Sequence, residues 1–189
     1  MSASSHKAFL AALEPHRGSL GAFCSRMVRD RADLEDALQT TLLEAFRKFE
    51  SFQPGTNFRA WVFRFAALTA LSVNRRRARA PDPLPEDPLP APEELALELE
   101  YDALLARPEL VRERLSDEVC RALDGLTERE RVIFLLKTIG NLTCAEAAHI
   151  LSVPIGTVMG LLARARGKLR ESLTEYARRE GYLSVEGRP

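Results

Sequence analysis

The chain has few of the side chains that form disulfides, metal centres and catalytic nucleophiles. Its 189 residues include 3 cysteines and 3 histidines. Cys24, Cys120 and Cys144 are odd in number, far apart and set in apolar helical patterns, so we expect reduced core thiols in a cytosolic protein. The histidines do not join them at metal-ligand spacing. We expect no metal, no cofactor and no enzymatic activity, because no nucleophile with a base and no carboxylate pair is indicated.

Long apolar runs are also missing. No uninterrupted apolar stretch reaches the roughly 18 residues of a transmembrane helix. The N-terminus lacks the compact apolar segment of a signal peptide. We therefore expect neither membrane insertion nor export.

Alternating runs of β-branched residues, the pattern of half-buried strands, are absent too. Apolar residues instead recur at helical spacing in two early segments, Leu20, Phe23, Cys24, Met27 and Val28, and then Leu34, Leu38, Leu42, Ala45, Phe46 and Phe49. This spacing predicts an all-α fold.

The net charge is zero, but the charge is unevenly distributed. Lys and Arg outnumber Asp and Glu by 13 to 7 over residues 1–80 and by 11 to 8 over residues 121–189, whereas acidic residues dominate by 12 to 3 over residues 81–120. Six of the 11 prolines fall between Pro81 and Pro92. Such a stretch cannot hold a helix or a central strand.

This pattern predicts two small helical domains joined by an acidic, proline-rich linker. The first domain is expected at residues 1–80, the linker at 81–118 and the second domain at 119–180. Residues 181–189 are expected to form a frayed tail.

Residues 143–170 predict a helix-turn-helix in the second domain. Thr143 and Glu146 have the spacing of a capping box, and Pro154 can open a second helix. That helix carries apolar residues at helical spacing, with basic residues between them at Arg164, Arg166, Lys168 and Arg170. One side can therefore pack while the other meets phosphate. A helical hairpin with a solvated basic face would show a similar pattern.

A long helix is expected at residues 57–79, after a turn at Pro54 and Gly55. It ends in a cluster of arginines, Arg75, Arg76, Arg77 and Arg79. Favourable charge at a helix C-terminus explains some of these residues. Their density favours phosphate contact.

Together these segments resemble the extracytoplasmic-function (ECF) sigma factors of bacterial RNA polymerase. Residues 33–46 and 54–64, followed by the arginine-rich helix end, are similar to the family's polymerase-binding and promoter-melting domain. Residues 126–136 and 142–166 resemble its minus-35-binding domain. The resemblance implies a cytoplasmic bacterial transcription initiation factor that binds core polymerase and promoter DNA, with an anti-sigma factor as a further partner.

The resemblance also assigns residues to partners. An acidic helix would dock on the clamp helices of the polymerase β′ subunit, through Asp33, Glu35, Asp36 and Gln39. Capture of melted minus-ten DNA is assigned to Trp61, Arg64, Asn74, Arg75, Arg76, Arg77 and Arg79. The resemblance assigns minus-35 binding to Thr143, Thr157, Val158, Met159, Gly160, Arg164, Arg166 and Lys168. It also implies that this domain contacts the β flap of the polymerase. For the acidic helix, a merely solvated face is the alternative interpretation, and for Trp61 the alternative is burial against Phe58, Val62 and Phe65.

The chain departs from the family at several positions. The family usually has an Arg-Asn pair in the long helix and an Asp one turn later, where this chain has Ala67, Leu68 and Ser72. A common Lys-Ser-Arg in the recognition helix is replaced by residues 159–161, Met-Gly-Leu, and an acidic residue of the docking helix by Thr40. Two hypotheses follow: an unusual promoter read through fewer polar contacts, or a sigma mimic that binds an anti-sigma factor or polymerase without reading DNA.

Overall fold

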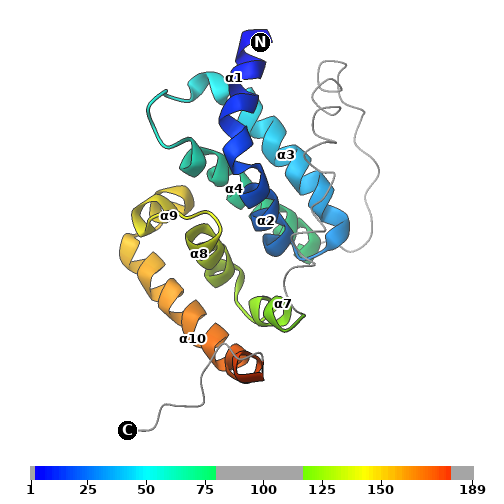
Figure 1. Cartoon of the computed structure of the whole chain (residues 1–189), viewed down its shortest axis with the longest axis vertical. Helices are drawn as coiled ribbons and strands as arrows, with labels where there is room; N and C mark the ends of the chain where they lie inside the picture. The colour runs from blue at the N-terminus through cyan, green and yellow to red at the C-terminus, as the bar shows by residue number, and fades with distance from the viewer. Residues whose placement is uncertain (1–2, 80–116, 180–189) are drawn as a thin grey trace. The chain divides into compact units, whose positions relative to one another are not determined.

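The computed structural model of the chain describes residues 3–79 and 117–179, and all regular secondary structure in these ranges is helical (Figure 1). The chain divides into two compact units, with the boundary between Arg112 and Glu113. The all-α expectation is confirmed. The predicted tail and almost all of the predicted linker lie outside the described residues.

The described part of the first unit, residues 3–79, is a bundle of four α-helices linked by short 3₁₀ turns. The α-helices are α1 (Ala3–Leu13), α2 (Arg17–Met27), α3 (Leu34–Arg47) and α4 (Phe58–Arg79). The 3₁₀ turns are η1 (Glu14–His16), η2 (Arg31–Asp33) and η3 (Phe49–Ser51). α4 packs against both α2 and α3. The apolar residues of the two early segments are buried in this core, except Phe49, which is half-buried.

Local sequence fixes where α4 begins. The amide of Thr56 donates to the carbonyl of Gln53 over 3.2 Å. Gly55 sits between them with φ at +91°, a conformation that favours glycine, and Pro54 precedes it as expected in a type II turn. Asn57 then caps the helix, because its Oδ1 accepts from the amide of Ala60 over 3.2 Å. The predicted turn and helix start are confirmed.

The second unit also contains four described helices, α7 (Asp117–Asp124), α8 (Glu128–Thr138), α9 (Cys144–Leu151) and α10 (Ile155–Arg179). α10 packs against α7, α8 and α9. The axes of α9 and α10 differ by 108°, and the connection is residues 152–154. An angle of roughly 90–120° across such a short turn is the geometry of a helix-turn-helix. The predicted motif is confirmed.

Capping residues set the starts of α8 and α9. Thr143 accepts from the amide of Glu146 and Glu146 accepts from the amide of Thr143, which completes the predicted capping box. Thr127 and Glu130 form a second capping box at α8. Ser152 ends α9 in the left-handed conformation, with φ at 53°.

One thiol is buried as expected and two are less so. Cys24 is fully buried, and burial raises the pKa of its thiol to about 12. Cys120 and Cys144 are half-buried, so the expectation of core thiols holds only in part. Across the described ranges, no cluster of three or more potential metal ligands occurs.

No single described helix is both long and apolar enough to cross a membrane. Cys144–Leu151 and Ile155–Thr174 meet that criterion only as a bent pair, by length and composition.

Candidate protein and nucleic-acid interfaces

The acidic start of α3 is exposed, but one of its acids already has a partner. Glu35 and Asp36 lie in the first turn with exposed side chains, and Gln39 is half-buried. Asp33 accepts from Nη1 of Arg77 over 2.8 Å, and the same guanidinium contacts Asp30. A side chain assigned to polymerase and one assigned to DNA are therefore bound to each other.

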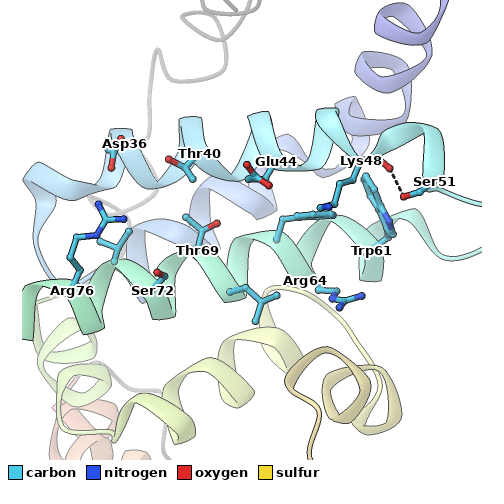
Figure 2. A pocket seen from close by; sticks show the side chains of 13 residues that line it. Asp36, Thr40, Glu44, Lys48, Ser51, Trp61, Arg64, Thr69, Ser72 and Arg76 are labelled. Carbon is cyan, nitrogen blue, oxygen red and sulfur yellow. Dashed lines mark hydrogen bonds between the residues drawn. The ribbon is translucent and has the colours of Figure 1, made fainter. Parts of the chain in front are cut away.

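A groove of about 720 Å³ runs between α3 and α4. Figure 2 shows Asp36, Thr40 and Glu44 projecting from successive turns of α3 toward the facing surface of α4. The α4 wall consists of Leu68, Thr69, Ser72, Val73 and Arg76, with Trp61, Arg64 and Phe65 nearer its start. At one end Ser51 donates to the carbonyl of Lys48 over 2.6 Å (Figure 2).

Sequence reasoning identified only part of this groove. Asp36, Trp61, Arg64 and Arg76 were assigned to interfaces, whereas Glu44 and Lys48 were not. The signal was available, since polar residues four apart on α3 share one helix face. What the sequence could not show is that this face lies against the exposed side of α4.

Trp61 lies in an aromatic cluster and is half-buried. Its ring centroid is 4.8 Å from that of Phe65, 5.3 Å from Phe52 and 5.4 Å from Phe58. The predicted packing of Trp61 against aromatic rings is therefore correct, but its side chain is only half-buried and not excluded from solvent. The exposed part of the indole faces the groove.

The arginine cluster at the end of α4 is heterogeneous. Arg75 and Arg76 are exposed, whereas Arg77 is held by Asp30 and Asp33. The side chain of Arg79 lies outside the described part of the chain.

Asn74 has a structural role instead of the predicted contact with DNA. It is 9% exposed, its Nδ2 donates to the carbonyl of Met27 over 3.0 Å, and its Oδ1 accepts from the amide of Arg29 over 3.2 Å. The amide thereby bonds two backbone groups after α2, and the buried carbonyl of Met27 would lack this partner without it.

The recognition helix α10 exposes some predicted contacts and buries another. Thr157 is exposed, Met159 is 59% exposed and Gly160 is half-buried. Val158 is only 1% exposed and packs in the core of its unit, so its side chain is not placed to contact DNA. The hydroxyl of Thr143 is used in the capping box of α9.

Glu130 of α8 links two of the predicted DNA-binding side chains to the core. Its side chain is almost completely buried, Lys168 Nζ lies 2.7 Å from Oε2, and Arg164 Nε lies 3.8 Å from Oε1. The hydrogen bond from Lys168, assisted by hydrogen bonds from Thr127, holds the pKa of the carboxyl at about 2. Sequence reasoning missed Glu130, although Thr127 three residues before it is a capping-box signal. Arg166 is exposed and forms no ion pair with the described residues.

Comparison with known proteins accounts for both units. The Sigma-70 region 2 family matches residues 12–80, and the Sigma-70 region 4 family matches residues 116–169. The chain is 27% identical over 170 residues to the ECF sigma factor SigW of Bacillus subtilis, covering 89% of this chain and 90% of that protein. The chain belongs to the ECF family of RNA polymerase sigma factors.

Other relatives agree with this assignment. An Escherichia coli ECF sigma-E factor is 28% identical over 181 residues, with 92% of this chain and 90% of that protein covered. SigG of Mycobacterium tuberculosis is 31% identical over 176 residues, and the match spans 86% of this ECF sigma factor but 48% of SigG.

Solved structures extend the likeness to three dimensions. The sigma factor RpoE from Bartonella quintana, solved with the anti-sigma factor NepR, matches with a TM-score of 0.67 at 25% identity, covering 89% of this chain and 98% of that one. The fold of CnrH, solved with the cytosolic domain of CnrY, matches with a TM-score of 0.60 at 23% identity and 90% coverage of both chains. This chain is accordingly a transcription initiation factor, and sigma factors are not enzymes.

Proposed function

We propose that this ECF sigma factor docks on core polymerase through exposed acidic side chains of its first unit and binds promoter DNA through exposed basic side chains of both units. Acidic side chains lie along the outer face of α3, whereas arginines are exposed near the end of α4 and along α10. This separation of acidic and basic surfaces is the observation that carries the proposal. The setting is the bacterial cytoplasm, where polymerase works.

Core polymerase would dock on the face of α3 that carries Glu35, Asp36 and Gln39. The β′ clamp helices are the proposed partner, and charge complementarity is the physical reason. Asp33 contributes less as a free charge because it pairs with Arg77. The helix-turn-helix unit would contact the β flap.

Melted minus-ten DNA would bind at the start of the α3–α4 groove and along α4. Trp61 offers a partly exposed aromatic face for a flipped base, with the exposed Arg64 one turn away. Aromatic stacking combined with cationic contacts is how proteins hold unpaired strands. Arg75 and Arg76 would extend the contact to phosphates.

Minus-35 duplex DNA would bind along α10. In a helix-turn-helix dock the first turns of the second helix meet base edges, which places Thr157, Met159 and Gly160 there. The phosphate backbone of the DNA would be contacted by Arg164, Arg166 and Lys168. Arg164 and Lys168 also contact Glu130.

Transcription in vitro by core polymerase on a fragmented genomic library tests the proposal. Adding this chain should start transcripts from a restricted set of fragments. Competition for core polymerase without new transcripts would instead support the sigma mimic. Because a related sigma factor was solved with an anti-sigma factor, we also propose such a protein as a partner of this chain, and its binding should suppress the transcripts.

A further inference from the structure

The first two turns of α10 expose two large apolar side chains. Ile155 is 49% exposed and Met159 is 59% exposed. Within residues 3–79 and 117–179, the only other exposed large apolar side chain is Leu68, at 43%. Met159 follows Ile155 by about one helical turn, so the two share one edge of α10.

The same edge continues into two arginines. Arg166 and Arg170 lie roughly three and four turns beyond Ile155 on this side of the helix. Both are exposed, and neither forms an ion pair within the described part of the chain. Arg164 and Lys168 lie on a different edge, where they contact Glu130. α10 therefore has an outer edge of Ile155, Met159, Arg166 and Arg170, which we call the apolar–arginine edge, and an inner basic edge that is tied to α8.

The chemistry of this edge fits duplex DNA better than a protein surface. Isoleucine and methionine offer no strong hydrogen-bonding group, and the apolar feature of a base pair in the major groove is the C5-methyl group of thymine. Two side chains cover far less than the roughly 1,200 Å² that stable protein interfaces bury. The two exposed arginines on the same edge complement a polyanion.

We propose that Ile155 and Met159 are specificity-determining residues that recognise neighbouring thymine methyl groups in the major groove, while Arg166 and Arg170 hold the flanking phosphates. The inference rests on the promoter-binding role proposed for α10 and adds the base that this helix reads. Entry of α10 into the groove is not obstructed beside the pair, because a Cβ atom added at Gly156 or Gly160 would meet no heavy atom within 4 Å.

Replacing thymine by deoxyuridine tests the proposal, because this change removes only the C5-methyl group. Holoenzyme assembled from the full chain and core polymerase first selects duplexes from a randomised library. Each thymine of the minus-35 part is then replaced in turn. Wild-type affinity should fall about fourfold for each contacted methyl group. Holoenzyme carrying Ile155→Ala and Met159→Ala together should bind both kinds of duplex equally.

The salt dependence tests the arginines. Arg166→Ala and Arg170→Ala should each flatten the slope of log affinity against log salt by about one. Arg164→Ala is the matched substitution on the inner basic edge of the same helix, and it should change the slope less. If all three substitutions changed the slope equally, the phosphate contacts proposed for Arg166 and Arg170 would be rejected.

The outcomes separate this inference from the function on which it rests. Holoenzyme that selects promoters but binds thymine and deoxyuridine duplexes equally would overturn the inference and leave sigma activity intact. Holoenzyme that selects no sequence would overturn both. If the double variant selected the same DNA as wild type but no longer bound a protein that wild type binds, the edge would be assigned to that protein partner instead. The comparison of thymine and deoxyuridine duplexes uses the wild-type protein alone, so it does not depend on the folding of any variant. Melting curves show whether the variants fold.

Discussion

α4 and α10 are the two longest helices in the described part of this sigma factor, and they use their polar side chains differently. At the end of α4, Asn74 holds the backbone at the end of α2 and Arg77 holds the acids that precede α3. These side chains fasten the bundle together. Arg75 and Arg76 remain exposed between them.

In α10 the ion pairs with the buried Glu130 lie on one edge of the helix. Arg164 and Lys168 meet Glu130, while Ile155, Met159 and Arg166 face solvent. Two arginine-rich helices thus present different surfaces. The comparison shows that an arginine-rich helix is not by itself a DNA-binding surface, since the partner of each side chain decides its role.

The largest expected effect tests the cluster at the start of α4. Trp61→Ala should lower the free energy of unfolding by about 3 kcal/mol, because the lost ring contacts leave a cavity beside Phe52, Phe58 and Phe65. Trp61→Phe keeps an aromatic ring and should lose less. Urea titration of the full chain measures both. If Trp61→Ala melted like wild type and yet promoter opening failed, the ring would serve DNA alone.

The next effect distinguishes Asn74 from its exposed neighbours. Asn74→Ala should cost about 2 kcal/mol, because the carbonyl of Met27 and the amide of Arg29 lose their partner. Arg76→Ala should leave stability within about 0.5 kcal/mol and weaken DNA binding. Thermal melting and a DNA titration measure the pair. The structural role of Asn74 would be excluded if its loss weakened DNA binding while the melting temperature stayed constant.

The sequence predicted the helices well because their signals are local. Capping at Thr143 and Glu146, the turn at Gly55 and the apolar spacing of α2 all depend on residues within a few positions of one another. Family resemblance then supplied the order of the two domains and the surfaces to examine.

Pairing between distant residues could not be read in this way. Asn74 is 47 residues from its acceptor at Met27, and Lys168 is 38 residues from Glu130. Both Asn74 and Lys168 were assigned to DNA because a polar or basic side chain on a helix looks the same in the sequence whether its partner is phosphate or protein. Val158 was also assigned to DNA, although its helical phase is that of the core positions and it is buried.

An effect of similar size tests the inner basic edge of α10. Lys168→Ala leaves the buried Glu130 without its nearest cation and should cost roughly 2 kcal/mol. The pKa of Glu130 is lowered to about 2 in the folded protein, so its contribution to stability is present above the ordinary pKa of a glutamate and is lost as the pH falls toward 2.

Denaturation measured from pH 6 down to pH 2 checks this direction. Wild type should lose stability across that interval more steeply than Glu130→Gln, which cannot titrate at this position. Parallel curves for the two proteins would show that Lys168 does not depress the pKa of Glu130.

The smallest expected effect on stability belongs to the acidic face of α3. Glu35→Lys and Asp36→Lys together should change the free energy of unfolding by less than about 1 kcal/mol, because exposed charges contribute little. Binding to core polymerase should nevertheless fall, since the reversed charges meet the proposed basic partner. Glu50→Lys makes one such change at an exposed position outside this face and is the control. Competition against a labelled sigma factor for core polymerase measures the difference. If the charge-reversed protein competed as well as wild type, the acidic face would be merely solvated. The docking surface would then lie elsewhere, with the α3–α4 groove as the next candidate.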